Sequence, residues 1–278
     1  MKIRNPVDNS YDILAEKYPD NDTVILNDVG ALYYDNNTVD SIAWINESPD
    51  ILEYYAQSMF KAPFYHNLFH RMEVGIQESG HHFKRLYTHD KRFSKFERAR
   101  IIKPATPSWI SDEDSRVYKK TKSLSYISSD KSYTPLQIKR CEVAKEIQKY
   151  NIPTFGRGHN EVDSKLEALS EFRFSLVIEN GIYAGYHTEK ILDCFRTGTV
   201  PIYCGDPDIG DVFDMEGIIR FDINKVQTLY PIYESLFTEK LYKSMLPAIE
   251  NNFELAMNYK NKPEDIMDEI LENEKNES

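Results

Sequence analysis

The stretch of residues 171–205 constrains the fold most, because strand-forming and helix-forming segments alternate in it. Residues 174–178 form a short apolar run rich in strand formers, and the polar Glu179 follows it. A helix is predicted over residues 188–197, and residues 200–204 read as a second strand. A strand, a helix and a second strand in this order form a βαβ unit, which predicts an α/β protein with a parallel sheet.

The end of the first of these strands and the start of the helix define a candidate ligand site. In open parallel sheets, ligands bind beyond the carboxyl ends of the strands, where a helix N-terminus offers N–H groups and positive dipole to an anion. Lys190 lies in the first helical turn, where a cation opposes the dipole, and this indicates a bound anion. Glu189 is a natural acceptor for a ribose diol. With Glu179, Asn180 and Tyr186 nearby, the pattern predicts a nucleotide or phosphate site, although a solvated Glu–Lys pair is the alternative.

Composition narrows the classes of function. The chain has 278 residues, which is enough for two domains of ordinary size. An apolar content of 41% and a charged content of 28% are typical of a soluble globular protein. The net charge of −11 argues against a general nucleic-acid surface, because neutralising phosphates requires clustered Lys and Arg.

Cysteine usage and the first residues bear on the cell compartment. Cys141, Cys194 and Cys204 occupy core-like positions, and an odd number of such cysteines indicates reduced packing residues. The first twenty residues lack the apolar core of a signal peptide, and no stretch approaches the length of a membrane span. We therefore expect a soluble, cytoplasmic protein with no membrane span and no nucleic-acid partner.

Two domains are predicted, with the boundary at residues 118/119. Residues 91–122 are charged and contain prolines, as expected of a loop or linker. The acidic tail 263–278 is predicted to fray after Leu271. The expected strands are residues 23–26, 31–34, 41–45, 83–87, 124–127, 152–155, 174–178, 200–204 and 217–221, and the expected helices are 48–59, 136–150, 164–169, 188–197, 226–236 and 239–259.

In the first domain, an acidic residue lies between a predicted strand and a predicted helix. Residues 41–45 read as a buried strand, and Ser48, Pro49 and Asp50 then give a helix start: an N-cap, a proline at the first position and an acid in the first turn. The cap accounts for Ser48 and Pro49 but not for Glu47, which precedes it. We expect Glu47 to face whatever lies beyond the strand ends.

A family resemblance rests on six short matches that occur in one order. Three segments that follow each other within residues 172–205 resemble the donor-binding signature of the α-1,3/4-fucosyltransferase family. They are FRFSLVIEN, YHTEK and ILDCFRTGTVPIYCG, with five residues between the first two. The I-S-S of residues 127–129, followed by Arg140, is similar to its I-S-N…R segment, with serine in place of asparagine. The F-G-R of residues 155–157 and the W-x-x-E-S-P of residues 44–49 complete the resemblance.

The resemblance implies a metal-independent, inverting glycosyltransferase of the GT-B type, with two Rossmann-like domains facing across a cleft. Residues 1–118 would form an acceptor-side domain, and residues 119–278, including the C-terminal helices, would hold the donor GDP-fucose. No cofactor and no metal is expected, and the partners would be the GDP-sugar donor and a glycan acceptor.

Seven residues receive roles from the same resemblance: Arg140 and Lys190 at the diphosphate, Glu189 at the ribose, Tyr186 and Asn180 in the walls of the donor pocket, Glu179 at the fucose, and Glu47 as the general base. Inversion requires the acceptor hydroxyl to attack opposite the leaving diphosphate, and a carboxylate must take its proton.

Four alternatives stay open. Asp206-Pro207-Asp208 follows a strand and is either a proline turn or the D-x-D that holds Mg²⁺ or Mn²⁺. His66 and His70 have the i, i+4 spacing of a zinc helix, although packing explains them as well. The transferred sugar can come from another GDP-sugar. The chain can also bind a sugar nucleotide or a glycan without catalysing a reaction.

Overall fold

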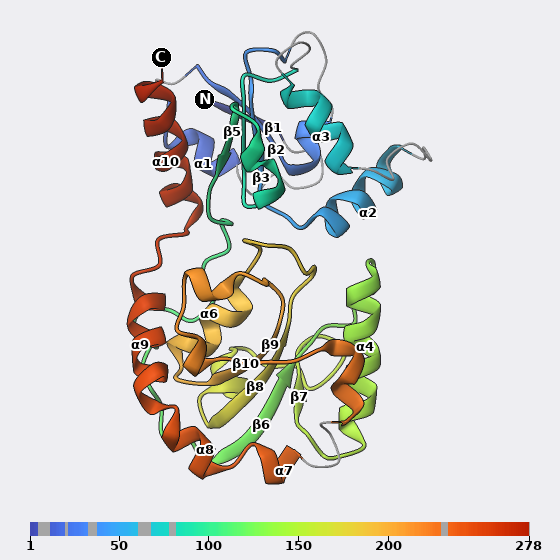
Figure 1. Cartoon of the computed structure of the whole chain (residues 1–278), viewed down its shortest axis with the longest axis vertical. Helices are drawn as coiled ribbons and strands as arrows, with labels where there is room; N and C mark the ends of the chain where they lie inside the picture. Colours follow the sequence, from blue (N-terminus) through green and yellow to red (C-terminus); the bar gives the residue numbers. More distant parts are fainter. Residues whose placement is uncertain are drawn as a thin grey trace. The chain divides into compact units, whose positions relative to one another are not determined.

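The computed structural model describes residues 1–4, 12–19, 22–32, 38–60, 68–77, 82–228 and 233–277. It contains two compact α/β units, each built on a five-stranded parallel sheet (Figure 1). The first unit comprises Met1–Thr106, Tyr183–Tyr186 and Lys260–Ser278, and the second comprises Pro107–Ile182 and His187–Tyr259. The α/β fold class predicted from the sequence is confirmed.

In the first unit the strands follow each other in sequence order, β1-β2-β3-β4-β5, and every neighbouring pair is parallel. The strands are β1 (Lys2–Arg4), β2 (Val24–Asn27), β3 (Ile42–Ile45), β4 (Arg85–Thr88) and β5 (Ala99–Ile101). The helical elements are α1 (Asp12–Glu16), η1 (Asp28–Leu32), α2 (Pro49–Phe60), α3 (Leu68–Ile76), η3 (Lys91–Lys95) and α10 (Pro263–Asn276).

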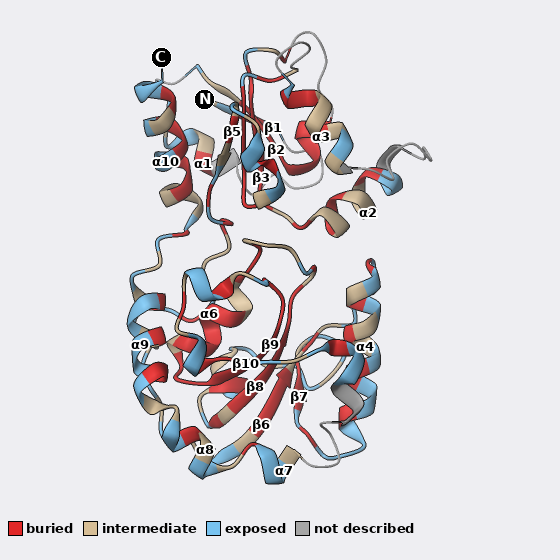
Figure 2. Cartoon of the chain, in the orientation of Figure 1, coloured by how far each residue is buried: buried red, intermediate tan, exposed pale blue. Residues whose placement is uncertain are grey.

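Side-chain alternation along the strands gives the first sheet two apolar faces. In β3, Ile42 and Trp44 pack with residues of α1 and α10, whereas Ala43 and Ile45 pack with residues of η1, α2 and α3. All four side chains are buried, and β2, β3, β4, β8 and β9 are buried along most of their length (Figure 2). A sheet covered on both faces explains why its strands read as continuous apolar runs rather than as alternating ones.

The acidic tail does not fray after Leu271, as the sequence predicted, but continues as α10 to Asn276. The apolar face of α10 packs on the first sheet, and Glu274 adds polar anchors. Glu274 Oε1 lies 2.5 Å from Arg85 Nε and accepts the Tyr87 hydroxyl at 2.8 Å. Burial of this face stabilises a helix whose composition alone suggests a solvated tail.

In the second unit the sheet order is β10-β9-β8-β6-β7, again with parallel neighbours only. The strands are β6 (Lys122–Ile127), β7 (Thr154–Phe155), β8 (Phe172–Ile178), β9 (Val200–Cys204) and β10 (Ile219–Arg220). The helical elements are α4 (Pro135–Gln148), α5 (Leu166–Leu169), α6 (Glu189–Arg196), η4 (Ile209–Asp211), η5 (Met215–Gly217), η6 (Ile223–Thr228), α7 (Tyr233–Leu236), α8 (Glu239–Ser244) and α9 (Leu246–Met257).

Several sequence expectations differ from the structure. Residues 31–34 were expected as a strand, but η1 extends to Leu32, and residues 33–37 lie outside the described part. The segment 91–122, expected as a linker, contains η3 and the edge strand β5. The helix expected over 239–259 is two helices, α8 and α9, with a proline at the start of the second. The helix expected over 226–236 is replaced by η6 and α7, and residues 229–232 lie outside the described part.

The two units do not coincide with the expected division of the chain. The sequence suggested a boundary at residues 118/119 and placed all C-terminal helices in the second domain. The compact units change between Thr106 and Pro107, and α10 belongs to the first unit because it covers one face of the first sheet.

Candidate active site

The strand order of the second sheet places a topological switch point at the carboxyl ends of β6 and β8. These strands are neighbours, but the chain continues from β6 to β7 on one side and from β8 to β9 on the other. Ligands of open parallel sheets bind at such a point. Arg140 of α4, which follows β6, meets Asn180, which follows β8: Arg140 Nη1 donates to Asn180 Oδ1 at 2.8 Å. Two predicted donor-site residues therefore lie together.

The Arg140 guanidinium is buried beside this switch point. Arg140 is 7% exposed, and among the described residues its Nε finds no hydrogen-bond acceptor. Buried polar groups are almost always paired, so an unused N–H on a buried cation marks a place where an anionic acceptor would be favourable.

Glu179 anchors the N-terminus of α6. Its carboxylate is fully buried and accepts the Thr188 backbone N–H at 2.9 Å and the Thr188 hydroxyl at 2.7 Å. Lys190 Nζ donates to the same carboxylate at 3.3 Å. Thr188 is the N-cap of α6, so Glu179 fixes the start of this helix at the end of β8. Its predicted contact with fucose stays a prediction.

Lys190 lies between two carboxylates, Glu179 and Glu189. Its Nζ is 3.3 Å from Glu179 Oε2 and 3.3 Å from Glu189 Oε1. Burial works to lower the pKa of Lys190, but the two carboxylates outweigh it and raise that pKa. Burial works to raise the pKa of Glu189, but the Lys190 and Lys165 ammonium groups lower it to about 2. Glu189 and Lys190 thus form the ion pair that the sequence offered as an alternative, but the pair is not fully solvated: the two side chains are only 16% and 19% exposed.

Gly205, directly after β9, leaves the space that the Glu179 side chain occupies. A Cβ at Gly205 would lie 2.4 Å from the Tyr203 hydroxyl oxygen and 2.6 Å from Glu179 Cγ. We expect Gly205→Ala to displace the Glu179 side chain, to lower the free energy of unfolding by about 1–3 kcal/mol and to weaken nucleotide binding. Urea unfolding and titration with GDP measure the two effects.

Gly210→Ala in η4 is a matched control for this substitution. Its Cβ would meet the flexible end of Met215, at 3.0 Å from Cγ, and can be accommodated by a rotation of that side chain. Gly210→Ala should therefore behave like the wild type in both measurements. Unchanged stability and GDP affinity in Gly205→Ala would contradict the tight packing beside Glu179.

The carboxylate of Asp206 is engaged within the protein. Its Oδ2 is 3.0 Å from His187 Nδ1, and its Oδ1 accepts the Asp208 backbone N–H at 2.8 Å. His187 Nε2 is 2.7 Å from the Tyr259 hydroxyl. Asp206-Pro207-Asp208 thus forms a turn bound to a histidine. Within the described ranges, no three His, Cys, Asp or Glu side chains are grouped to hold a metal ion. His66 of the possible zinc pair lies outside the described residues.

Glu47 lies at the carboxyl end of β3 in the first unit, as the sequence predicted for the strand end. Asp28 Oδ1 accepts the backbone N–H groups of Asn46 and Glu47 at 2.6 and 3.0 Å, which fixes the turn after the strand. The half-buried Glu47 carboxylate accepts the Tyr186 hydroxyl at 3.4 Å, and its backbone carbonyl lies 3.1 Å from His89 Nε2. The Glu47 backbone is therefore held by Asp28, and its carboxylate is held by Tyr186.

Two details of this region differ from the expectations. Helix α2 begins at Pro49 as predicted, but the buried Ser48 hydroxyl forms no capping hydrogen bond with any described residue. Tyr186, expected in the walls of the donor pocket, packs in the first unit with its ring centroid 4.9 Å from that of His89. Its role at the donor stays a prediction.

Comparison with known proteins adds a family to this geometry. Residues 117–227 match the model of the family described as Glycosyltransferase family 10 (fucosyltransferase) C-term. The match falls within the second unit apart from residues 183–186, and we refer to the matched residues 117–227 as the family 10 domain. The matched residues contain all five strands of the second sheet and six of the seven predicted site residues, Arg140, Glu179, Asn180, Tyr186, Glu189 and Lys190.

A curated relative and two solved structures are similar to the chain. The alpha-(1,3)-fucosyltransferase FucT of Helicobacter pylori is 32% identical over 101 residues, which are 34% of this chain and 21% of that protein. The structure of WaaG, a glycosyltransferase involved in lipopolysaccharide biosynthesis, aligns with a TM-score of 0.51 and 13% identity, over 93% of this chain and 80% of that one. An alpha1,3-fucosyltransferase crystallised with GDP gives a TM-score of 0.49 and 15% identity, over 87% and 80%.

The similarities differ in how much of each protein they cover and in whether they concern sequence or fold. The matched segment of the curated relative is about a fifth of that protein's length. At 13% identity, the likeness to WaaG concerns the fold, and it supports the predicted GT-B type. None of the described helices is long and apolar enough to cross a membrane.

Sequence reasoning missed two charged residues, Lys165 and Asp193, that lie beside the predicted ligand-binding residues of the family 10 domain. Lys165 precedes α5, and its Nζ is 2.5 Å from Asp193 Oδ2 and 3.7 Å from Glu189 Oε1. The i, i+4 spacing of Glu189 and Asp193 on α6 signals two acids on one face. Nothing in the local sequence indicates that a lysine from another segment neutralises them.

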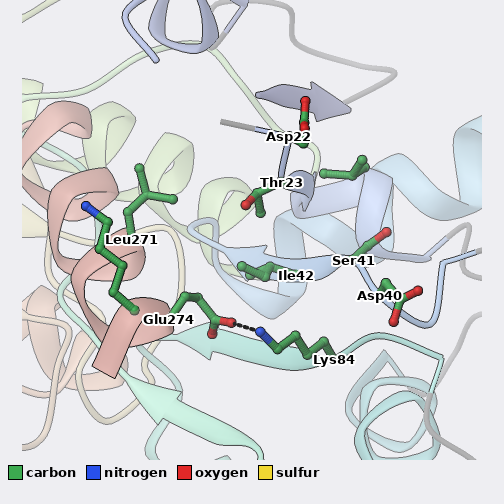
Figure 3. Close-up of a pocket in the computed structure, with 10 residues that line it drawn as sticks. Asp22, Thr23, Asp40, Ser41, Ile42, Lys84, Leu271 and Glu274 are labelled. Atoms are coloured by element: carbon green, nitrogen blue, oxygen red, sulfur yellow. Dashed lines mark ion pairs between the residues drawn. The ribbon is translucent and has the colours of Figure 1, made fainter. Parts of the chain in front are cut away.

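A pocket in the first unit lies away from Glu47. It has a volume of about 370 Å³ and lies next to α10, at the amino ends of β2 and β3 (Figure 3). Lys84 and Glu274, paired at 2.7 Å, form part of its wall. Because Glu47 follows the carboxyl end of β3, this pocket is not part of the predicted catalytic site.

Proposed function

We propose that the chain is an inverting glycosyltransferase that moves fucose from GDP-fucose to a hydroxyl of a glycan acceptor, without a metal ion. The family 10 domain would bind the donor, with Arg140 and Lys190 at the diphosphate, Glu189 at the ribose, and Asn180 beside Arg140. Glu179 would hold α6 and orient the fucose. Glu47 would take the proton of the attacking hydroxyl.

One observation carries the proposal. At the switch point of a family 10 domain, the buried Arg140 guanidinium and the half-buried Lys190 ammonium lie beside the N-terminus of α6. The GDP leaving group gains negative charge in the transition state. Fixed cations and the free N–H groups of a helix stabilise that charge where it develops, which is the task a metal performs in other transferases.

In the proposed reaction, Glu47 acts on the acceptor hydroxyl, and the two cations act on the leaving diphosphate. The acceptor hydroxyl forms a bond to the anomeric carbon, the bond from that carbon to the diphosphate breaks, and the hydroxyl proton moves to the Glu47 carboxylate. A positioned general base contributes about 10²–10⁴-fold to the rate. The His187 contact of Asp206 supports a structural use of the D-x-D carboxylate rather than a metal-binding one.

The test measures release of GDP from GDP-fucose with and without a panel of glycan acceptors. We expect acceptor-dependent release that EDTA does not abolish. If the chain bound GDP-fucose but released no GDP with any acceptor, it would be a binding protein and not a transferase. If GDP were released only from another GDP-sugar, the transferred sugar would not be fucose. Loss of activity in EDTA that Mn²⁺ restores would assign a metal to the reaction.

A further inference from the structure

A lysine outside the predicted site contacts the acid proposed to bind the ribose. Lys165 Nζ is 3.7 Å from Glu189 Oε1, and Lys190 Nζ approaches the same oxygen at 3.3 Å. The two ammonium groups therefore share one carboxylate oxygen. This arrangement restrains the rotation of the Glu189 carboxylate.

Lys165 is itself fixed from two sides. Its Nζ donates to Asp193 Oδ2 at 2.5 Å and lies 4.1 Å from the centroid of the Trp109 ring. Asp193 is 1% exposed, and its Oδ1 accepts the Ser108 hydroxyl at 2.6 Å and the Trp109 backbone N–H at 2.7 Å. A buried carboxylate and an aromatic face together hold the ammonium group in one position.

The position of Lys165 matters because Glu189 and Asp193 are like charges one turn apart on α6. Such pairs repel each other. The Lys165 ammonium contacts both carboxylates and offsets this repulsion. The Glu189 side chain keeps 16% of its surface exposed, and an ionised carboxylate can accept two hydrogen bonds from a diol.

We propose that Lys165 is a positioning residue that orients Glu189 toward the ribose diol of the donor nucleotide. The inference rests on the proposed function, in which Glu189 binds the ribose. It adds a specificity: the chain prefers nucleoside diphosphates with both ribose hydroxyls over their deoxy forms.

The test is calorimetric titration of GDP and of 2′,3′-dideoxyguanosine diphosphate into the wild type and Lys165→Met. We expect the wild type to bind GDP about tenfold more tightly than the dideoxy analogue, which lacks hydrogen bonds to a charged acceptor. In Lys165→Met this preference should largely disappear, with affinity for the analogue unchanged. Lys165→Arg, which keeps the charge, should retain the preference.

Controls separate positioning from folding. Lys149→Met removes an exposed lysine paired with Glu146 on α4 and should leave both affinities unchanged. If Lys165→Met does not fold, Lys165→Gln keeps a neutral donor for Asp193 and replaces it in the experiment. Equal weakening of both nucleotides would overturn the inference, because a purely structural lysine has that effect.

The outcome for the wild type distinguishes the inference from the proposed function. A wild-type chain that binds GDP and the dideoxy analogue equally overturns the inference and leaves the proposed function in place. A wild-type chain that binds neither overturns both.

Discussion

Replacing Glu47 by glutamine is expected to reduce fucosyl transfer by about 10²–10⁴-fold while GDP binds almost as tightly as to the wild type. Glutamine has the shape of glutamate, so the Tyr186 hydroxyl and the Ser48 N–H, which donate to the Glu47 carboxylate at 3.4 and 3.3 Å, keep an acceptor. What the substitution removes is the ability to take a proton. Transfer rates at saturating donor and acceptor, together with a GDP titration, measure the two effects separately.

Asp50→Asn provides a matched control for the Glu47 variant. Asp50 is a second carboxylate at the start of α2 and accepts the Tyr183 hydroxyl at 3.0 Å. Its neutralisation changes the charge of the same segment by the same amount and should leave the transfer rate within about twofold of the wild type, because no catalytic proton is assigned to it. If Glu47→Gln lost as much GDP affinity as Lys190→Ala, Glu47 would be a nucleotide ligand and not the base.

Lys190→Ala is expected to weaken GDP binding by about 10- to 100-fold, because a hydrogen-bonded cation contributes about 1.5–3 kcal/mol to the binding of an anion. The stability of the free protein should change less than its affinity for GDP. Glu179 keeps both Thr188 donors, at 2.9 and 2.7 Å, so the start of α6 should stay in place. Titration with GDP measures the affinity, and thermal unfolding reports whether the helix is retained.

Lys139→Ala is the control for this variant. Lys139 lies next to Arg140 on α4 and pairs with Glu142 at 3.2 Å. The loss of one positive charge is the same, but we expect the GDP affinity to stay within about twofold, since a surface ion pair contributes little. An equal loss of affinity in both variants would mean that the diphosphate responds to net charge and not to a specific ammonium group.

The pH dependence of stability gives a second readout for Lys190→Ala. The pKa of Glu189, lowered from 4.5 to about 2, contributes stability that is complete above pH 4.5 and is lost as the pH falls toward 2. Removal of Lys190 raises this pKa back toward its ordinary value. The free energy of unfolding of the variant should therefore fall less steeply between pH 4.5 and pH 2.

The central strands and the helix after Thr188 could be predicted from the sequence because their signals are local. β8 and β9 are buried in a parallel sheet, so they read as apolar runs, and residues 200–204 were predicted with the bounds that β9 has. Gly198, with φ of +67°, follows the C-cap of α6 as the pattern of helix ends requires. The edge strands β1 and β5 were missed because each is three residues long and carries charged side chains.

Long-range contacts explain what could not be predicted. The charged sequence of α10 resembles a disordered tail, and contacts with Arg85 and Tyr87, 189 and 187 positions earlier, give Glu274 its buried partners. The site shows the same division. Arg140 and Lys190 were identified from motifs, whereas Lys165 reaches Glu189 through the fold and belongs to no recognisable pattern.

The docking of α10 on the first sheet means that one cut cannot separate the two halves of this chain. A fragment of residues 1–106 would present Trp44 and Tyr87, which pack with the apolar face of α10, to water and would tend to self-associate. A fragment from Pro107 onward would carry an amphipathic helix without the surface it covers. Exchanging the second unit between relatives therefore requires two junctions, one near Pro107 and one near Tyr259, so that the final helix stays with the sheet it completes.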